Sequence, residues 1–193
     1  MSRLQSILEY NEEFVSKGAY EPYITDKFST KKMVIVTCMD SRLVELLPRA
    51  LNLKNGDAQI IKTAGAVVSH PFGSVMRSIM VAIYSLKASE VLVIGHHDCG
   101  MTGLNSASIL DKAKDRGVSD EVFSTLTNAG IKLSRWLTGF DDVQQAVEGS
   151  VDLIQRHPIL PRDVYVHGLI IDPKTGKLDL VIDGTKQGNK YDN

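Results

Sequence analysis

Short apolar runs with the length of β-strands alternate with longer helical patterns along this chain, and this alternation is the strongest constraint on its fold. The run Val91–Ile94 is apolar throughout, as is typical of a strand buried on both faces of a parallel sheet. Strands separated by helices imply right-handed crossovers and a sheet covered on both sides. We therefore expect an α/β fold with a mostly parallel central β-sheet, an antiparallel edge strand and helices on both faces. The predicted strands are Met33–Thr37, Ala58–Lys62, Val91–Ile94, Val164–Ile171 and Leu178–Ile182.

Helical patterns fill the stretches around these strands. Valines recur every four residues in Asp142–Gln155, and Pro158 follows shortly after this pattern, which marks a helix and its end. Residues 172–177 form a turn sequence that joins the last two strands as a hairpin. We expect residues 1–193 to form a single domain, with residues 1–30 as an N-terminal helical arm. The other predicted helices are Arg3–Ser16, Ser74–Lys87 and Ser119–Leu137.

The composition argues against two classes of partner. Hydrophobic residues make up 43% of the chain and charged residues 23%, and the formal net charge is -1. A nucleic-acid-binding protein or a polybasic membrane-binding protein carries a basic excess that this chain lacks. The first residues have no secretory signal pattern, and no apolar run is long enough to span a bilayer. We therefore expect no nucleic acid, no membrane and a cytoplasmic location.

Two polar loops that follow predicted strands carry the only two cysteines of the chain. Cys38 follows the first strand, and His96 and Cys99 follow the third. Ligands of such sheets bind outside the carboxyl ends of the strands, so the two loops can converge on one site. Two thiolates and one imidazole match the three protein ligands of a catalytic zinc, which keeps its fourth position open. Asp40 and Arg42 add a carboxylate and a positive charge nearby, so the pattern predicts a zinc enzyme.

Other interpretations of these cysteines are weaker. A disulfide between Cys38 and Cys99, or a pair of plain buried thiols, is the alternative that the sequence leaves open. A cysteine phosphatase needs an arginine six residues after its cysteine, where this chain has Val44. Residues 95–102 have the glycine spacing of a nucleotide-binding P-loop, but Met101 occupies the position of its lysine. We therefore favour a metal site.

The two motifs together resemble the signature of the β-class carbonic anhydrases. The matching segments are Cys-x-Asp-x-Arg at residues 38–42 and Gly-His-x-x-Cys-Gly at residues 95–100. The resemblance covers residues 33–183 and is closest to the compact prokaryotic branch of the family. The zinc ligands that it implies are Cys38, His96 and Cys99, and the catalytic dyad that it implies is Asp40 and Arg42.

The resemblance also implies an activity, which is the zinc-dependent, reversible hydration of carbon dioxide to bicarbonate and a proton by a homodimer or higher even oligomer. The alternatives are hydrolysis of carbonyl sulfide or carbon disulfide at the same site, or a non-catalytic zinc-binding relative. We expect Gly65, Ala66 and Gly100 to line the substrate pocket, with Gly100 adding backbone N–H groups if it opens a helix. Family members often have Arg-Asn at the position of residues 62–63, so the pocket is expected to differ in detail. In part of the family the equivalent of Asp40 is a fourth zinc ligand, and the sequence leaves this open.

The remaining histidines are expected to have structural roles. His97 should point away from the side chain of His96, because adjacent residues on an extended backbone alternate in direction. His70 is expected in a loop or cap, His157 at a helix end, and His167 in the core with a hydrogen-bond partner.

Overall fold

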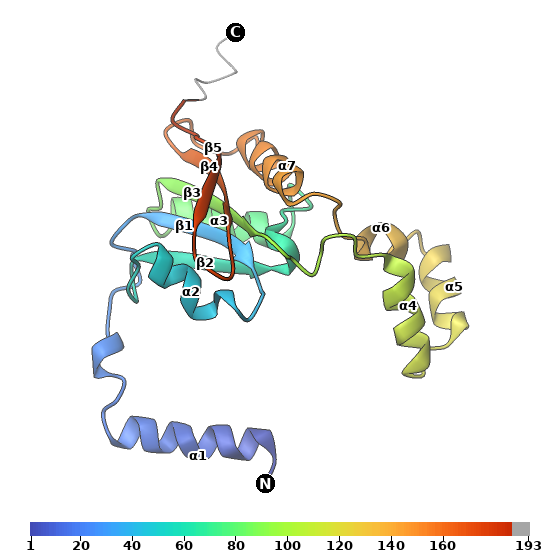
Figure 1. Cartoon of the computed structure of the whole chain (residues 1–193), viewed down its shortest axis with the longest axis horizontal. Coiled ribbons are helices and arrows are strands. Elements are labelled where there is room, and N and C mark those ends of the chain that lie inside the picture. Colours follow the sequence, from blue (N-terminus) through green and yellow to red (C-terminus); the bar gives the residue numbers. More distant parts are fainter. Residues whose placement is uncertain (187–193) are drawn as a thin grey trace.

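A five-stranded sheet forms the centre of the computed structural model, which describes residues 1–186 (Figure 1). The strand order is β2-β1-β3-β4-β5, and only the pairing of β4 with β5 is antiparallel. This confirms the expected fold class, and every strand end lies within two residues of its predicted position. The expected domain continues over residues 187–193, which lie outside the described residues. The strands are β1 (Met33–Cys38), β2 (Ala58–Thr63), β3 (Glu90–His96), β4 (Tyr165–Ile171) and β5 (Leu178–Ile182).

Helices pack on both faces of the sheet. On one face, α3 (Ser74–Tyr84) and α7 (Val143–Gln155) cover apolar side chains that include Val34 of β1. On the other face, α2 (Leu43–Ala50) packs over Ile35 of the same strand. Both strand residues are 0% exposed, and they separate because successive side chains of a strand point to opposite faces. The buried apolar clusters on the two faces therefore hold the sheet between its helices.

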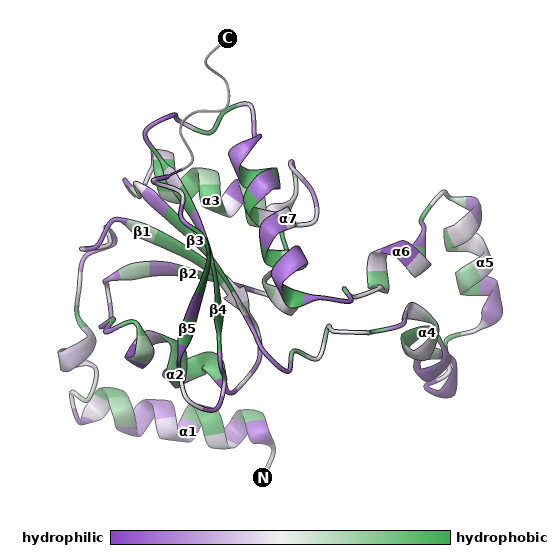
Figure 2. Ribbon diagram, turned by 45° about the horizontal axis from the view of Figure 1, so that its top comes forward, coloured by the Kyte–Doolittle hydropathy of each residue, from purple (hydrophilic) through white to green (hydrophobic). Residues whose placement is uncertain are grey.

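Two helical segments extend away from this body (Figures 1 and 2). The N-terminal one consists of α1 (Arg3–Ser16), which has no buried residue, and the 3-10 turn η1 (Glu21–Tyr23). The second lies between β3 and α7 and consists of α4 (Ser106–Asp115), α5 (Asp120–Asn128) and α6 (Leu133–Leu137). Within residues 1–186, none of the helices combines the length and the apolar character that crossing a membrane requires.

Some helical predictions differ from the structure. The helix predicted to reach Lys87 ends at Tyr84, and Lys87 has a φ of 62° outside the helix. The single helix predicted over Ser119–Leu137 is wrong, because Gly130 adopts a φ of 82° and divides it into α5 and α6. Neither α2 nor α4 is predicted from the sequence. The helix α2 is not predicted because it contains Pro48, and a proline in this position normally indicates that a helix is broken.

Candidate metal centre

The loops after β1 and β3 meet at one edge of the sheet, because these strands are parallel neighbours. Cys38 is the last residue of β1, His96 is the last residue of β3, and Cys99 lies in the turn that follows. All three side chains are buried, and their potential ligand atoms lie within 4.8 Å of one another. The structure therefore brings together the three residues that the sequence predicts as zinc ligands.

The geometry of this cluster fits a metal ion. The Sγ atoms of Cys38 and Cys99 are 3.9 Å apart and both thiols are free. Two sulfurs bound to one tetrahedral zinc at ~2.3 Å lie about 3.8 Å apart, whereas a disulfide would bring them to about 2.05 Å. The structure thus favours the metal site over the disulfide that the sequence leaves open.

The imidazole of His96 is held in the tautomer that a metal requires. Its Nδ1 lies 2.8 Å from the carbonyl oxygen of His97. Because a carbonyl can only accept, Nδ1 carries a proton, and Nε2 is the nitrogen that the neutral imidazole can offer to a metal. This Nε2 atom is buried and has no hydrogen-bond partner within residues 1–186. A buried acceptor without a partner is costly, and a metal ion between His96 and the two thiols would satisfy it.

The two thiols differ in their electrostatic surroundings. Burial raises the pKa of Cys38, but the His96 imidazole and the backbone amides of Asp40 and Gly65 outweigh burial, so the pKa is lowered overall. The Gly65 amide donates to the Cys38 sulfur at 3.4 Å. Burial also raises the pKa of Cys99. The backbone amide of Met101 opposes this effect without outweighing it, so the pKa of Cys99 is raised overall. Cys38 is therefore the first thiol to ionise, and a bound dication would also favour the thiolate of Cys99.

Asp40 and Arg42 form a two-pronged ion pair beside the cluster. The Nε and Nη2 atoms of Arg42 donate to the two carboxylate oxygens of Asp40 at 3.0 and 2.8 Å, and the Arg42 backbone amide adds a bond of 2.9 Å. These bonds lower the pKa of Asp40 to about 2. The Oδ2 atom of Asp40 lies 3.8 Å from Nε2 of His96. The ionised carboxylate, which only accepts hydrogen bonds, is thus paired with Arg42 and adjoins the metal-binding cluster.

Asp98 is a residue of this site that is not predicted from the sequence. Nη1 of Arg42 donates to its Oδ2 at 2.8 Å, and Nη2 donates to its carbonyl oxygen at 2.9 Å. The available signal is an acidic residue between the ligands His96 and Cys99. The motif does not indicate which way this side chain points, and its contact with Arg42 is visible only in the folded loops.

Gly65 and Ala66 lie in the 3-10 turn η2 (Ala64–Ala66), directly after β2, and both are buried. Gly65 has a φ of 73°, and a Cβ added there would lie 2.6 Å from Cε1 of Phe140. Only glycine fits this close approach. The turn thus supports Cys38 through the Gly65 amide.

The third predicted pocket residue, Gly100, does not open a helix. It is exposed and lies in a turn, and α4 begins at Ser106. The helix N-terminus expected at Gly100 is therefore absent, because the chain continues through residues 101–105 before it becomes helical.

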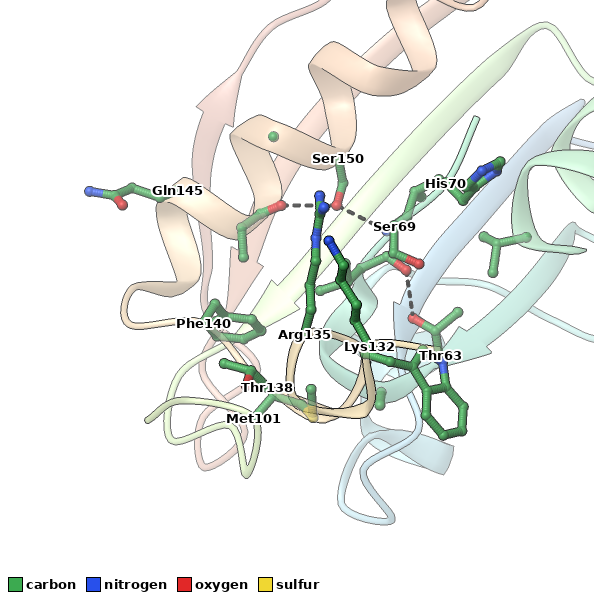
Figure 3. Close-up of a pocket in the computed structure, with 18 residues that line it drawn as sticks. Thr63, Ser69, His70, Met101, Lys132, Arg135, Thr138, Phe140, Gln145 and Ser150 are labelled. Atoms are coloured by element: carbon green, nitrogen blue, oxygen red, sulfur yellow. Dashed lines mark hydrogen bonds between the residues drawn. The ribbon is translucent and has the colours of Figure 1, made fainter. Parts of the chain in front are cut away.

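A cavity of about 910 Å³ lies beside η2 (Figure 3). Thr63 and Ala64 contribute to its wall, whereas Gly65, Ala66 and Gly100 are not among the described residues that line it. Met101 and Phe140 also line it, and both would meet a Cβ added to Gly65, so the cavity adjoins the turn that supports Cys38. The cationic side chains on its wall, Lys132 and Arg135, come from the α6 region, and no acidic residue among residues 1–186 lines it.

The remaining histidines lie outside the cluster. The Nε2 atom of His97 is 3.5 Å from a carboxylate oxygen of Asp179, and the His97 side chain is 51% exposed. His70 is in a loop and its Nδ1 accepts the Phe72 amide, as expected of a capping residue. His167 accepts the amide of Gly184, which confirms its predicted hydrogen-bond partner, but the residue is only partly buried and does not belong to the core. His157, two positions after the last residue of α7, is buried.

Known proteins resemble this chain over most of its length. The family model described as Carbonic anhydrase matches residues 33–178. The chain is 64% identical over 184 residues to "Putative carbonic anhydrase YvdA" of Bacillus subtilis (strain 168), covering 95% of this chain and 93% of the relative. It is 26% identical over 158 residues to a carbon disulfide hydrolase of Acidithiobacillus thiooxidans, covering 78% and 77% of the two chains.

A solved structure agrees with this assignment. The crystal structure of β-carbonic anhydrase isoform I from Trichomonas vaginalis matches with a TM-score of 0.85 and 32% identity, covering 95% of this chain and 100% of that chain. The resemblance inferred from the two motifs is therefore confirmed in sequence and in fold. This chain belongs to the β-carbonic anhydrase family.

Proposed function

We propose that this protein is a zinc-dependent carbonic anhydrase, a lyase that reversibly hydrates carbon dioxide to bicarbonate and a proton. The observation that carries the proposal is the position of the Asp40–Arg42 ion pair against a buried cluster of two thiols and one imidazole. Oδ2 of Asp40 lies 3.8 Å from the unpartnered Nε2 of His96. Membership of the family supports the same activity.

Cys38, His96 and Cys99 would hold the zinc ion. When bound, zinc supplies a Lewis acid that lowers the pKa of a coordinated water and so makes it a nucleophile near neutral pH. The two thiolates contribute two negative charges to the site, which weaken this effect relative to three neutral histidines. Arg42 returns a positive charge to the edge of the site, since its side chain pairs with Asp40.

Asp40 orients the attacking group. With a pKa of about 2 it is ionised at neutral pH, so it can only accept a hydrogen bond. By accepting the hydrogen of the nucleophile it turns the oxygen lone pair towards carbon dioxide. Arg42 holds the carboxylate in this orientation through both oxygens, and the released proton passes to buffer.

The direct test is a stopped-flow pH-indicator assay of carbon dioxide hydration with the zinc-loaded protein and its metal-free form. We expect the loaded protein to accelerate hydration strongly and the metal-free form to be inactive. Equal rates for the two forms would contradict the proposal.

The second candidate function uses the same site on a sulfur substrate. The relative from Acidithiobacillus thiooxidans that hydrolyses carbon disulfide favours it. Carbon dioxide, carbonyl sulfide and carbon disulfide are all linear and uncharged, so the metal cluster and the dyad do not separate them. Comparing kcat/KM for carbon dioxide, carbonyl sulfide and carbon disulfide on one preparation decides between the two functions. A non-catalytic relative would be expected to have a damaged dyad, whereas Asp40 and Arg42 are paired here.

We further propose that the protein acts as a homodimer or higher even oligomer in the cytoplasm. Helix α1 has no buried residue, and Leu4, Ile7 and Leu8 are at least half exposed. A second copy of the chain would cover these side chains and so remove apolar surface from water. The outer edge of β5 offers further backbone groups for pairing. A reducing compartment suits the two free thiols.

A further inference from the structure

The guanidinium of Arg42 joins the two loops that form the candidate site. It donates two side-chain hydrogen bonds to Asp40, from Nε and Nη2, at 3.0 and 2.8 Å. It donates two more to Asp98, from Nη1 to the carboxylate at 2.8 Å and from Nη2 to the carbonyl oxygen at 2.9 Å. Asp40 follows β1 and Asp98 follows β3, so one planar group connects the carboxyl ends of two neighbouring strands.

This arrangement restricts how Arg42 can turn. The five N–H donors of a guanidinium lie in one plane with fixed directions. If only Asp40 were present, the group could follow the Asp40 carboxylate wherever it moved. With Asp98 on its other edge, rotation of the plane breaks bonds to Asp98. The orientation of Asp40 relative to His96 therefore depends on contacts that Arg42 makes with the loop of the metal ligands.

The contribution of Asp98 is one of geometry rather than of net ion-pair energy. Its side chain is 74% exposed and that of Arg42 is 39% exposed. An isolated exposed ion pair contributes little to stability, whereas paired hydrogen bonds to a guanidinium give a defined direction. The backbone carbonyl of Asp98 provides a second contact that does not depend on the side chain.

We propose that Asp98 is a positioning residue for the catalytic dyad, because it holds the outer edge of Arg42 and so keeps Asp40 directed at the metal-binding cluster. This inference rests on the proposed function for its effect on catalysis, but the position of Arg42 is measurable without activity. Asp98 does not contact the reacting atoms, and its action passes through Arg42.

The backbone at Asp98 determines which variants are informative. Its φ is 54°, a left-handed conformation that asparagine, aspartate and glycine tolerate best. Asp98→Gly therefore removes the carboxylate without straining the loop, and Asp98→Asn keeps one acceptor oxygen but removes the charge. Asp179→Asn is the matched control, because its exposed carboxylate pairs with Lys177 and neighbours His97 but does not contact Arg42.

The first measurement uses the zinc-free protein. The side-chain N–H signals of Arg42 are followed by proton–nitrogen NMR and assigned through their loss in Arg42→Lys. We expect sharp, slowly exchanging signals in the parent and in Asp179→Asn, broadened signals in Asp98→Asn, and loss of the signals in Asp98→Gly. Unchanged Arg42 signals in Asp98→Gly would overturn the inference. If circular dichroism shows that Asp98→Gly is unfolded, the Arg42 signals of Asp98→Asn are compared with those of the parent instead. Unchanged signals in Asp98→Asn would then overturn the inference.

The second measurement separates kcat from KM for carbon dioxide hydration by the zinc-loaded proteins. We expect kcat to fall about tenfold in Asp98→Gly, the lower end of the loss typical for residues that support a metal site, with less effect in Asp98→Asn and little change in KM. A parent-like kcat in both variants, with zinc content intact, would contradict the effect on catalysis. If the parent itself hydrates no carbon dioxide, the proposed function fails, and the NMR comparison still decides whether Asp98 positions Arg42.

Discussion

The sulfur atoms of Cys38 and Cys99 lie 3.9 Å apart although 61 positions separate them in the sequence. The parallel pairing of β1 with β3 brings the two loops together, and the last residue of β3, His96, completes the set. This separation matches two sulfurs on one tetrahedral zinc ion. The most direct predictions therefore concern metal content.

Replacing Cys99 with serine should release most of the bound zinc, because a hydroxyl is a much poorer zinc ligand than a thiolate. Zinc per chain is measured by elemental analysis after dialysis against a mild chelator. His97→Ala is the control, since its side chain is half exposed and lies outside the cluster, and it should keep its zinc. Full zinc occupancy in Cys99→Ser, or none in the parent, would show that the cluster is not a zinc site.

Asp40→Asn should retain zinc but lower kcat for carbon dioxide hydration by about 100-fold or more, the usual scale of acid–base and orienting groups. The amide can donate a hydrogen bond to the nucleophile and so turn its lone pair away from the substrate. Stopped-flow rates, normalised to zinc content, test this prediction. A variant with parent-like rates would leave the dyad with a structural role only.

The pH dependence of stability should report the Asp40–Arg42 pair. Arg42 lowers the pKa of Asp40 to about 2 in the folded protein, against about 3.9 for an unfolded aspartate. A carboxyl group whose pKa is lowered on folding stabilises the protein above its unfolded pKa, and this contribution is lost as the pH falls towards the folded pKa. The zinc-free parent should therefore exceed zinc-free Asp40→Asn in stability by a constant amount above about pH 5, and by less between about pH 4 and pH 2.

Urea unfolding of both zinc-free proteins across this range measures the difference in free energy of unfolding. A difference in free energy of unfolding that stays constant down to about pH 2, or that changes near neutral pH, would contradict the ion pair between Asp40 and Arg42.

Gly65→Ala should destabilise the fold. The φ of 73° disfavours alanine, and the new Cβ would lie 2.6 Å from Cε1 of Phe140, so we expect a loss of about 1–3 kcal/mol in the free energy of unfolding. Gly149→Ala is the control, because this glycine lies within α7 with open space around it and alanine favours a helix by about 0.5–1 kcal/mol. Equal stability of Gly65→Ala and the parent in urea unfolding would contradict the close packing of η2.

The exposed apolar residues of α1 should be needed for assembly. Replacing Leu4, Ile7 and Leu8 by serine should lower the mass measured by light scattering from that of an even oligomer, because this helix has no buried residue within its own chain. The control changes Glu9 and Glu12 of the same helix to glutamine and should leave the mass unchanged. A monomeric parent would contradict the proposed assembly.

Much of the fold follows from local patterns. Runs such as Val91–Ile94 predict buried strands because their apolar side chains need cover on both faces, and all five strands form close to their predicted positions. The helix Arg3–Ser16 agrees at both ends. The set of candidate metal ligands could also be predicted from the sequence, because cysteine and histidine at the ends of strands are compatible with only a few kinds of site.

Features that depend on contacts between distant segments were decided only by the tertiary structure. Pro48 sits within a helix because tertiary packing of Leu43 and Leu47 outweighs the local preference against proline. The contact of Arg42 with Asp98 depends on two loops that meet only when β1 pairs with β3. The sequence by itself determined which chemical groups are present and which strands carry them. The direction of each side chain at the site was decided by the tertiary structure, because it depends on loop conformations and on neighbours from other strands.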